Sequence, residues 1–454
     1  MQADRVFTNG TIVTPHSRFK GDIGVKEGKV MFISQVADET YPSEVVPLDG
    51  KFVLPGPIDG HVHFQDPGIT HREDIEHGTG AAAAGGITTC ISHPLNVPPV
   101  VDVSSYEETL EIYEGRACVD YALHGGGTSD NIGDITSLWR ATGATSLKMF
   151  MCFSVAEFPF VQDGAMFAIL EKLAAENGLA IIHAESEALV KLTEARIKNT
   201  GRRDPRAHVE SRPVMVEVEA VRRAIFLLEQ TGASAVILHV SSVEALYEID
   251  NARRRGVKVW AETCPHFFTF SIDDMDRHGP YLKFTPVMRD EANRQKLWEL
   301  LAKGFVHTIG SDHCPYTTEE KERGADDIWK APNGLPGLEI LLPVMLDGVN
   351  KRLVSLEKVV EVTSANPAKI YGLAPQKGEI TPGSDADFTI VDMNLEKTYT
   401  AKIGPSKCEW SPYDGMAFKG WPVMTVVRGE VVCANDKLQV TPGYGKYIKR
   451  SKSE

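Results

Sequence analysis

Apolar and polar residues alternate at both ends of the chain. The alternation runs through about the first 50 residues, where the pairs Asn9-Gly10 and Glu27-Gly28 mark turns. It returns after Gly378 and includes the runs 387–391 and 423–432. A period of two residues predicts short strands that bury one face. Because neither end is long enough to bury a core alone, we expect residues 1–50 and 375–454 to form one composite β-sandwich domain.

The middle of the chain, residues 51–374, has a different pattern. Short apolar runs alternate with helix-like segments, which predicts βα units around a parallel sheet. Helices are expected at Ala165–Asn177 and Glu217–Thr231, each ending before a glycine, and the run Ala81–Ala84 predicts a helix start. We expect the strands at residues 52–58, 87–92, 119–124, 144–151, 179–184, 234–240, 257–262 and 305–310.

Eight strand–helix units over this length predict an α/β fold, with a (β/α)8 TIM barrel spanning residues 51–374. In such barrels the active site lies at the C-terminal ends of the strands. A doubly wound open sheet is the alternative, and the number of strands alone does not exclude it.

Composition and charge limit the kinds of molecule that the protein is expected to bind. The chain has 454 residues and a formal net charge of -14 at pH 7, which disfavours nucleic acid and an anionic membrane surface. We expect no signal peptide and no membrane span, because no apolar run has the necessary length. The seven cysteines form no Cys-x-x-Cys pair, which is typical of reduced thiols in a cytoplasmic protein.

Chemically useful side chains recur where the predicted strands end. His61 and His63 lie two residues apart and therefore point from the same face of their strand. Each histidine alone could be a hydrogen-bonded core residue, and Asp312 could cap a helix. Their shared placement favours ligands of zinc or a similar divalent ion. The candidates at strand ends are His61, His63, His183, His239 and Asp312.

Lys148 lies in the apolar run 145–151. A charged ammonium group there is costly unless it is paired, neutral or chemically altered. Three interpretations stay open: the side chain reaches the barrel mouth, it forms a Schiff base with a carbonyl substrate, or CO2 carbamylates it. The carbamate would be anionic and able to bridge two cations.

Taken together, these motifs give the chain a family resemblance. It resembles the cyclic amidohydrolases of the hydantoinase, dihydropyrimidinase, allantoinase and dihydroorotase group over nearly its whole length, with a C-terminal third most similar to L-hydantoinases. The motifs are Asp59-Gly60-His61-Val62-His63-Phe64, Gly78-Thr79-Gly80 through Gly85-Gly86-Ile87-Thr88-Thr89, Lys148-Met149-Phe150, Cys264-Pro265-His266, Gly310-Ser311-Asp312-His313, Lys377-Gly378 and Gly383-Ser384-Asp385-Ala386-Asp387.

The resemblance implies a metal-dependent hydrolase with two divalent ions, Zn2+ before Mn2+ or Co2+. It implies that a CO2-derived carbamate on Lys148 bridges the ions, and that Asp312 acts as general base and then as general acid. It also implies a small cyclic ureide or imide substrate and a homotetramer or dimer. By the same resemblance, one ion is held by His61, His63 and Asp312, and the other by His183 and His239.

Departures from the family pattern bear on the substrate. Gln65 stands where dihydroorotases have an arginine for the substrate carboxylate, which argues against dihydroorotate unless Arg72 takes over. Phe153 replaces a tyrosine of D-hydantoinases and dihydropyrimidinases, and serves as a hydrophobic wall or as loop packing. His93 replaces the methionine of the allantoinase motif, and its role is open. Asn96 either binds a ureide or holds a loop.

Two further positions match family contacts to the ring imide, Thr285 and Asn333, which act largely through backbone groups. We therefore expect the opening of a hydantoin-type ring to an N-carbamoyl acid. Conversion of allantoin to allantoate is the alternative, followed by dihydropyrimidinase and dihydroorotase activity. The complete ligand set argues against a non-catalytic relative, and Lys148 argues against a deaminase.

Overall fold

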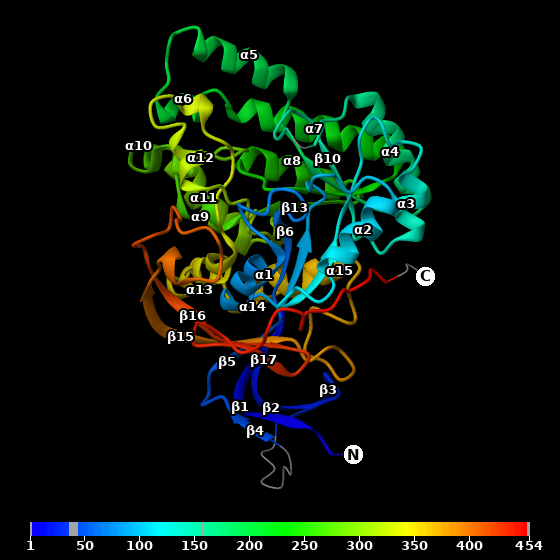
Figure 1. The fold of residues 1–454 in the computed structure, drawn as a ribbon, viewed down its shortest axis with the longest axis vertical. Helices are drawn as coiled ribbons and strands as arrows, with labels where there is room; N and C mark the ends of the chain where they lie inside the picture. The colour runs from blue at the N-terminus through cyan, green and yellow to red at the C-terminus, as the bar shows by residue number, and fades with distance from the viewer. Residues whose placement is uncertain (1, 36–43, 157, 452–454) are drawn as a thin grey trace.

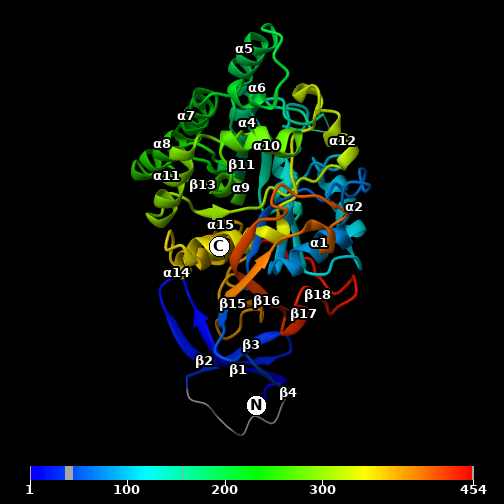
Figure 2. The same cartoon turned by 90° about the vertical axis from the view of Figure 1, so that its left-hand side faces the viewer.

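Both ends of the chain meet in one sheet beneath a barrel. The computed structural model describes residues 2–35, 44–156 and 158–451. Residues 1, 36–43 and 452–454 of the predicted terminal segments lie outside the described residues. The barrel and its helices lie above the sheet in both views (Figures 1 and 2). The α/β class and the combination of a parallel barrel with a terminal sheet agree with the prediction, while the exact domain division stays a prediction.

A short apolar strand, β5, lies in the middle of the terminal sheet and joins the strands from the two ends of the chain. Its strands run in the order β18-β17-β16-β15-β5-β1-β2-β3, and β4 pairs with β1. The strand β5 pairs with β1 on one side and with β15 on the other, which links the two ends of the chain. The bounds are β1 (Arg5–Val13), β2 (Arg18–Lys26), β3 (Lys29–Ser34), β4 (Glu44–Pro47), β5 (Phe52–Pro55), β15 (Phe388–Thr398), β16 (Ala417–Val427), β17 (Glu430–Ala434) and β18 (Lys437–Leu438).

The terminal sheet has a small hydrophobic core, formed by the apolar residues that alternate with polar ones in the sequence. Phe7, Ile23 and Val53 pack there with Phe388 and Ile390 from the other end of the chain. The rings of Phe7 and Phe388 meet edge to face with centroids 4.7 Å apart. The two terminal segments therefore form one shared core, as expected because neither is long enough to bury a core alone.

The barrel strands are parallel and occupy eight positions. One arc has the order β6-β7-β8 and the other β14-β13-β12-β11-β10-β9, and β8 continues into β9 through His124. The His63 N–H donates to the His313 carbonyl at 2.8 Å, and this bridge closes the ring. The bounds are β6 (Ile58–Val62), β7 (Thr89–Ser92), β8 (Asp120–Leu123), β9 (Gly125–Gly126), β10 (Leu147–Phe150), β11 (Leu179–His183), β12 (Ser234–Ile237), β13 (Val259–Thr263) and β14 (Thr308–Ile309).

Closure removes the open-sheet alternative, and each predicted strand region contains a strand. The prediction of a single strand at 52–58 is wrong in one respect. The structure divides this run into β5, which belongs to the terminal sheet, and β6, which begins the barrel. Gly56 and Pro57 separate the two, and Pro57 cannot donate a ladder hydrogen bond.

Helices surround the barrel, and their ends follow local capping. Asp74 caps α1 through its side chain, so this helix starts well before Ala81–Ala84, which forms its end rather than its start. Gly232 ends α7 in the left-handed region, with φ 71°, as predicted. The α-helices are α1 (Ile75–Ala84), α2 (Val103–Tyr113), α3 (Ile135–Ala141), α4 (Asp163–Ala175), α5 (Glu187–Lys198), α6 (Pro205–Glu210), α7 (Val214–Thr231), α8 (Val243–Arg254), α9 (Pro265–Thr269), α10 (Met275–His278), α11 (Glu291–Ala302), α12 (Thr318–Glu322), α13 (Leu341–Asn350), α14 (Leu356–Val360) and α15 (Asn366–Ile370).

Short helical turns complete the connections. A π-helical segment, η5 (Glu361–Ala365), joins α14 to α15. The 3-10 turns are η1 (Ile272–Asp274), η2 (Gly279–Leu282), η3 (Ile328–Lys330), η4 (Leu338–Ile340) and η6 (Ala401–Ile403). Within the described part of the chain, we find no helix with the length and apolarity needed to cross a bilayer.

A buried ion cluster fastens the barrel to the terminal sheet. The Lys377 Nζ lies 2.5 Å from Asp120 at the start of β8, 2.5 Å from Asp387 beside β15 and 2.9 Å from Asp385. Arg428, which lies in the turn between β16 and β17, also pairs with Asp120. Three carboxylates in a buried space need this lysine, because uncompensated buried charge is costly. The cluster therefore makes the two parts of the fold depend on each other.

We predict that Lys377→Ala lowers the free energy of unfolding by about 3–5 kcal/mol, because buried Asp387 loses its cation and Asp120 and Asp385 each lose one of two. Lys29→Ala is the matched control: Lys29 also pairs with Asp385, at 2.6 Å, but its side chain is 47% exposed, and such pairs contribute about 0–1 kcal/mol. Urea unfolding of both variants measures the difference. Equal losses in the two would contradict the role of the cluster.

Candidate metal centre and active site

The ends of the barrel strands bring the six sequence-predicted metal-ligand candidates to one narrow cavity of about 40 Å3. Lys148 lies within β10 and His183 ends β11, so these two side chains come from neighbouring parallel strands. His239 lies two residues beyond the end of β12, and Asp312 three residues beyond the end of β14. The cavity is lined by His61, His63, Lys148, His183, His239 and Asp312, with further residues described below.

Two groups of nitrogen and oxygen atoms form within this cavity. The Asp312 Oδ1 lies 3.1 Å from the His61 Nε2 and 3.4 Å from the His63 Nε2. On the other side, the His183 Nδ1 lies 3.0 Å from the His239 Nε2. The His61 ring is also 5.3 Å, between centroids, from the rings of both His63 and His239. The division of the ligands between two ions therefore stays a prediction.

The donor set fits a divalent cation on its chemistry. The Nδ1 atoms of His63 and His239 are buried, and neither has a hydrogen-bond partner among the described residues. A buried ring nitrogen without a partner is costly, whereas imidazole nitrogens and a carboxylate are the ligands that zinc takes in catalytic sites. The residues present therefore fit metal ions.

Carboxylates behind the histidines fix their rings. The Glu262 Oε1 lies 2.6 Å from the His61 Nδ1, and its other oxygen accepts from the Tyr371 hydroxyl at 3.2 Å. The Glu185 Oε2 lies 2.9 Å from the His183 Nε2, and Arg212 donates to the same oxygen at 2.7 Å. Carboxylate–histidine pairs of this kind orient the ligands of metal sites.

Burial and neighbouring charge set the protonation of the site. Burial lowers the pKa of Lys148 to about 7, although Asp312 and Glu262 oppose the shift. Burial would also lower the pKa of His61, but Asp312 and Glu262 raise it to about 9. Burial lowers the pKa of His63 to about 4. A large part of the Lys148 population is therefore neutral near pH 7, and the neutral amine is the form that reacts with CO2.

Three residues near the site have a backbone conformation that residues other than glycine rarely adopt. The φ angles of Gln65, His239 and Asp312 are 57°, 37° and 51°, all in the left-handed region. Such non-glycine conformations cost about 1–3 kcal/mol each and persist where the surroundings impose them. Each follows closely after a barrel strand, where the turn directs the chain across the strand ends.

The predicted substrate contacts divide into two groups. Thr285 and Asn333 line the cavity, and the Asn333 Oδ1 is buried without a hydrogen-bond partner among the described residues. Phe153 is 56% exposed and lines an adjoining cavity of about 540 Å3 together with Phe160 and Trp329. Asn96 is buried but does not belong to the lining of the narrow cavity.

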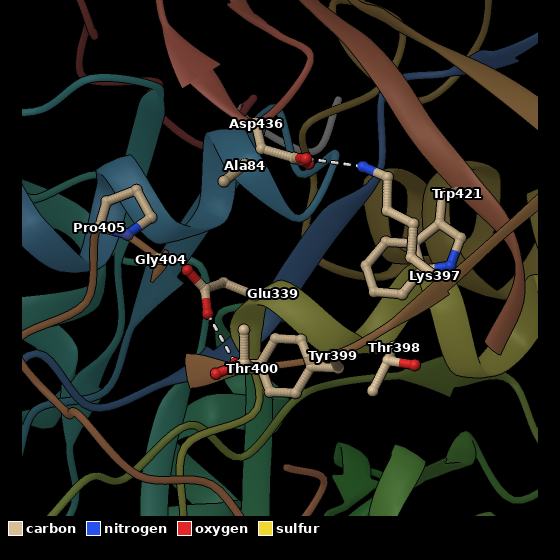
Figure 3. Close-up of a pocket in the computed structure, with 10 residues that line it drawn as sticks. All are labelled: Ala84, Glu339, Lys397, Thr398, Tyr399, Thr400, Gly404, Pro405, Trp421 and Asp436. Carbon is tan, nitrogen blue, oxygen red and sulfur yellow. Dashed lines mark hydrogen bonds and ion pairs between the residues drawn. The ribbon is translucent and has the colours of Figure 1, made fainter. Parts of the chain in front are cut away.

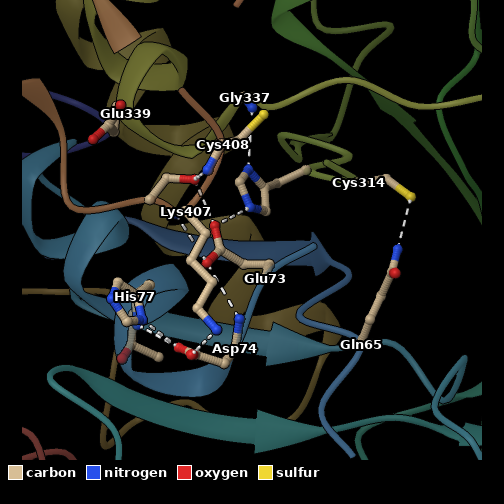
Figure 4. A network of polar contacts seen from close by, with 12 residues as sticks. Gln65, Glu73, Asp74, His77, Cys314, Gly337, Glu339, Lys407 and Cys408 are labelled. Atoms are coloured by element: carbon tan, nitrogen blue, oxygen red, sulfur yellow. Dashed lines mark hydrogen bonds and ion pairs between the residues drawn. The ribbon is translucent and has the colours of Figure 1, made fainter. Parts of the chain in front are cut away.

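Gln65 also lies outside the cavity lining, held by two neighbours. Its Nε2 donates to the Cys314 Sγ at 3.5 Å (Figure 4), and its Oε1 accepts from Arg72 at 3.2 Å. Arg72 donates to Glu320 at 2.7 and 3.0 Å and lies 4.2 Å from the centre of the Tyr316 ring. The guanidinium group of Arg72 is thus already paired, so it is not free to bind a substrate carboxylate.

Two carboxylates behind the site were not identified from the sequence. Glu262 and Glu185 had a local signal, because the first ends a predicted strand and the second follows His183 by two residues. Cys314 lines the cavity, and burial raises the pKa of its thiol to about 12, which makes it a poor nucleophile. The apolar part of the lining is formed by Leu95, Phe150, Val155 and Phe284.

A separate cavity, of about 390 Å3, lies against the terminal sheet (Figure 3). Lys397 pairs there with Asp436 at 2.6 Å, and the Tyr399 hydroxyl donates to the Glu339 Oε2 at 2.7 Å, while the Glu339 Oε1 is buried without a partner among the described residues. Its ten labelled lining residues include no histidine or cysteine. The chemistry of the molecule therefore concentrates at the barrel mouth.

Comparison with known proteins identifies the family of the chain. The model of the amidohydrolase family matches residues 52–432. The chain belongs to the amidohydrolase family. It is 38% identical to an L-hydantoinase of Paenarthrobacter aurescens over 99% of each chain, and 35% identical to an allantoinase of Deinococcus radiodurans over 97% of this chain and 98% of the relative.

Solved structures give the same result. The L-hydantoinase (dihydropyrimidinase) from Arthrobacter aurescens superposes with a TM-score of 0.97 at 38% identity, covering 99% of this chain and 100% of that one. The match confirms the predicted TIM barrel with its β-sandwich. The relatives confirm the predicted class of enzyme, a cyclic amidohydrolase. Amidohydrolases of this kind depend on a binuclear metal centre, and this chain has histidine and carboxylate groups able to bind metal.

We predict that Glu262→Gln weakens metal binding about 10–100-fold, because the His61 ring loses its carboxylate partner. Glu339→Gln is the control, since Glu339 lies at the separate cavity by the terminal sheet and its carboxylate accepts a hydrogen bond from the Tyr399 hydroxyl rather than from a histidine. Competition with a chromophoric chelator measures both affinities. Unchanged affinity in Glu262→Gln would mean that the His61 ring is held without its carboxylate.

Proposed function

We propose that this amidohydrolase opens hydantoin-type rings by hydrolysing a ring C–N bond to give an N-carbamoyl acid. The observation that carries the proposal is the convergence of two imidazole pairs, Lys148 and Asp312 on one narrow cavity that Thr285 and Asn333 also line. The 38% identity to an L-hydantoinase over the whole chain supports a hydantoin-type ring.

We assign one divalent ion to His61, His63 and Asp312, and the other to His183 and His239, with a carbamate on Lys148 shared between them. Zn2+ is the expected metal before Mn2+ or Co2+, because imidazole suits it. Bound divalent ions supply Lewis acidity, which lowers the pKa of water toward about 7. The lowered pKa of Lys148 supports the carbamate, because it provides the neutral amine.

The side chains of this protein would then handle the proton and the ring. Asp312 takes a proton from the attacking water and returns it to the departing ring nitrogen, as general base and then acid. Its position, 3.1 Å from His61 and 3.4 Å from His63, keeps it beside the predicted ligands. Thr285 and Asn333 orient the ring imide, and Phe153 forms a wall of the adjoining cavity.

The charge of the cavity supports a ring without a carboxylate substituent. Apart from its histidines, Lys148 is the only cationic residue in the described cavity lining. Arg72, which could have replaced the arginine missing at Gln65, is paired with Glu320. Allantoin hydrolysis is the second candidate, because an allantoinase is 35% identical over 97% of this chain. Dihydropyrimidinase and dihydroorotase activities come after it.

A cytoplasmic homotetramer or homodimer is proposed on the family resemblance alone. Equilibrium sedimentation of the purified enzyme tests the assembly, and a monomer at micromolar concentration would refute it.

We predict that a substrate panel with metal-loaded enzyme gives the highest kcat/KM for hydantoin or a 5-substituted hydantoin. Allantoin should follow, then dihydrouracil, and dihydroorotate should be poorest, because its carboxylate finds no free guanidinium group. Ring opening is measured by chromatography of the products. Preference for dihydroorotate would overturn the interpretation of Gln65, and ammonia as first product would indicate deamination.

We predict that Lys148→Ala loses bound metal and activity together, since it removes the anion that the two ions are proposed to share. Added short carboxylic acids should restore part of both, because they supply an anion in the vacated space. Metal content is measured by elemental analysis, and ring opening by product chromatography. A Lys148→Ala enzyme with two bound ions and full turnover would contradict the bridging carbamate.

A further inference from the structure

One segment at the cavity rim supplies lining residues to both cavities at the barrel mouth. Asn333 and Gly334 line the narrow cavity, and Ala331 and Asn333 line the larger one beside it. Residues 331–334 belong to no helix or strand, so no ladder of backbone hydrogen bonds fixes them. Their carbonyls still need donors, because a buried carbonyl without a partner is unfavourable. The groups that hold this segment therefore determine where Asn333 lies.

Two buried lysines supply donors to the segment. The Lys283 Nζ donates to the Ile328 carbonyl at 2.8 Å and to the Ala331 carbonyl at 2.6 Å. The Lys321 Nζ donates to the Pro332 carbonyl at 3.1 Å and to the carbonyl of Lys283 itself at 3.0 Å. The relative exposures of the two lysines are 5% and 0%. An ammonium group has three N–H donors, so each lysine can hold two carbonyls at once.

Lys283 also connects this segment to the other predicted contact with the substrate ring. Its carbonyl accepts from the Gly334 N–H at 3.0 Å. Thr285, which lines the narrow cavity, lies only two residues further along the chain. The side chain and the backbone of one residue thus join the segment of Asn333 to the segment of Thr285. Loss of these hydrogen bonds would change the spacing of the two predicted ring contacts.

Burial of the two lysines has a cost that packing alone does not explain. Burial lowers the pKa of Lys283 to about 8 and that of Lys321 to about 7, because an ammonium group loses its hydration. The buried Lys377 pairs with three carboxylates, whereas the hydrogen bonds of Lys283 and Lys321 go to main-chain carbonyls. An apolar side chain of the same length would fill the space without this cost, but it would leave the carbonyls without donors.

We propose that Lys283 and Lys321 are positioning residues for the ring-opening reaction: they hold residues 331–334 so that Asn333 and Thr285 contact the same ring. The proposal rests on the proposed function and adds two residues to it. Lys321 belongs to the described lining of neither cavity, so its effect on the substrate passes through the segment. The alternative is that both lysines only stabilise the fold.

The test replaces each lysine by methionine, which keeps a long unbranched side chain but has no N–H donor. We expect Lys283→Met and Lys321→Met each to raise the KM for unsubstituted hydantoin at least about tenfold, because a hydrogen bond to the ring is lost or lengthened. The kcat and the metal content should stay near wild type, since this contact is made in the ground state and the transition state alike. Hydantoin has no C5 substituent to reach the larger cavity, so the KM reports on the ring contacts. Loss of metal or of kcat together with the rise in KM would indicate general structural damage and overturn the proposal.

Lys377→Met is the matched control, because it makes the same change in a buried lysine whose partners are carboxylates at the terminal sheet. Lys358→Met is a milder control: the Lys358 side chain is 17% exposed and pairs with Glu361 at 2.6 Å. We expect both controls to keep the wild-type KM at a temperature where circular dichroism shows them folded. An equal rise in KM in a folded control would attribute the effect to lost stability and overturn the proposal.

Hydrogen exchange tests the segment independently of turnover. We expect the amides of residues 328–334 to exchange faster in Lys283→Met and Lys321→Met than in the wild type or in Lys358→Met, because local opening becomes easier. Wild-type exchange in this segment, or a wild-type KM in Lys321→Met, would overturn the positioning role and leave the proposed function intact. A wild-type enzyme that opens no cyclic ureide or imide would instead refute the proposed function itself.

Discussion

The contact that closes the barrel determines the rest of the site. The His63 N–H donates to the His313 carbonyl at 2.8 Å, so the first barrel strand is held against the segment that follows the last. Asp312 is the residue before that carbonyl, and closure therefore brings its carboxylate to 3.1 Å from His61. An open sheet would leave these residues at opposite edges. The left-handed φ of 51° at Asp312 is the local cost of turning its side chain inward at this seam.

Electrostatic balance is the second constraint on the site. Four imidazoles and the Lys148 amine line a small buried cavity, whose own carboxylate is Asp312, with Glu262 behind His61. Two divalent cations would add positive charge to this set, which a protonated lysine would oppose. Conversion of Lys148 to a carbamate changes its charge from positive to negative and so resolves the conflict. The lowered pKa of Lys148 and its proposed modification thus follow from the same burial.

Periodicity and strand ends predicted much of this architecture because both are local properties. The eight strand regions and the residues at their ends needed only apolar runs and the rule that parallel strands end on one side. Whether 52–58 forms one strand or two depends on long-range pairing of β5 with β1 and β15, which no local pattern contains. Likewise, Ala81–Ala84 is a good helical run, but the helix start was set by the Asp74 side chain. The partnership of Gln65 with Arg72 and Cys314 joins positions up to 249 residues apart and appeared only with the fold.

The fold also distinguishes residues that could contact the proposed substrate ring from residues that hold the site in place. Arg72 could have served either purpose from its place in the sequence. Its contacts with both oxygens of Glu320 and its stacking over Tyr316 favour a supporting role, since bidentate guanidinium–carboxylate pairs are strong and fixed in geometry. Of the predicted substrate contacts, the neutral polar residues Thr285 and Asn333 line the narrow cavity. The larger cavity, which Phe153 and Trp329 line, adjoins it. The narrow cavity thus suits the proposed uncharged ring, since its lining holds no arginine. The adjoining cavity does have basic residues, but each of them already has a carboxylate or carbonyl partner: Lys191, Lys198, Arg212 and Lys283.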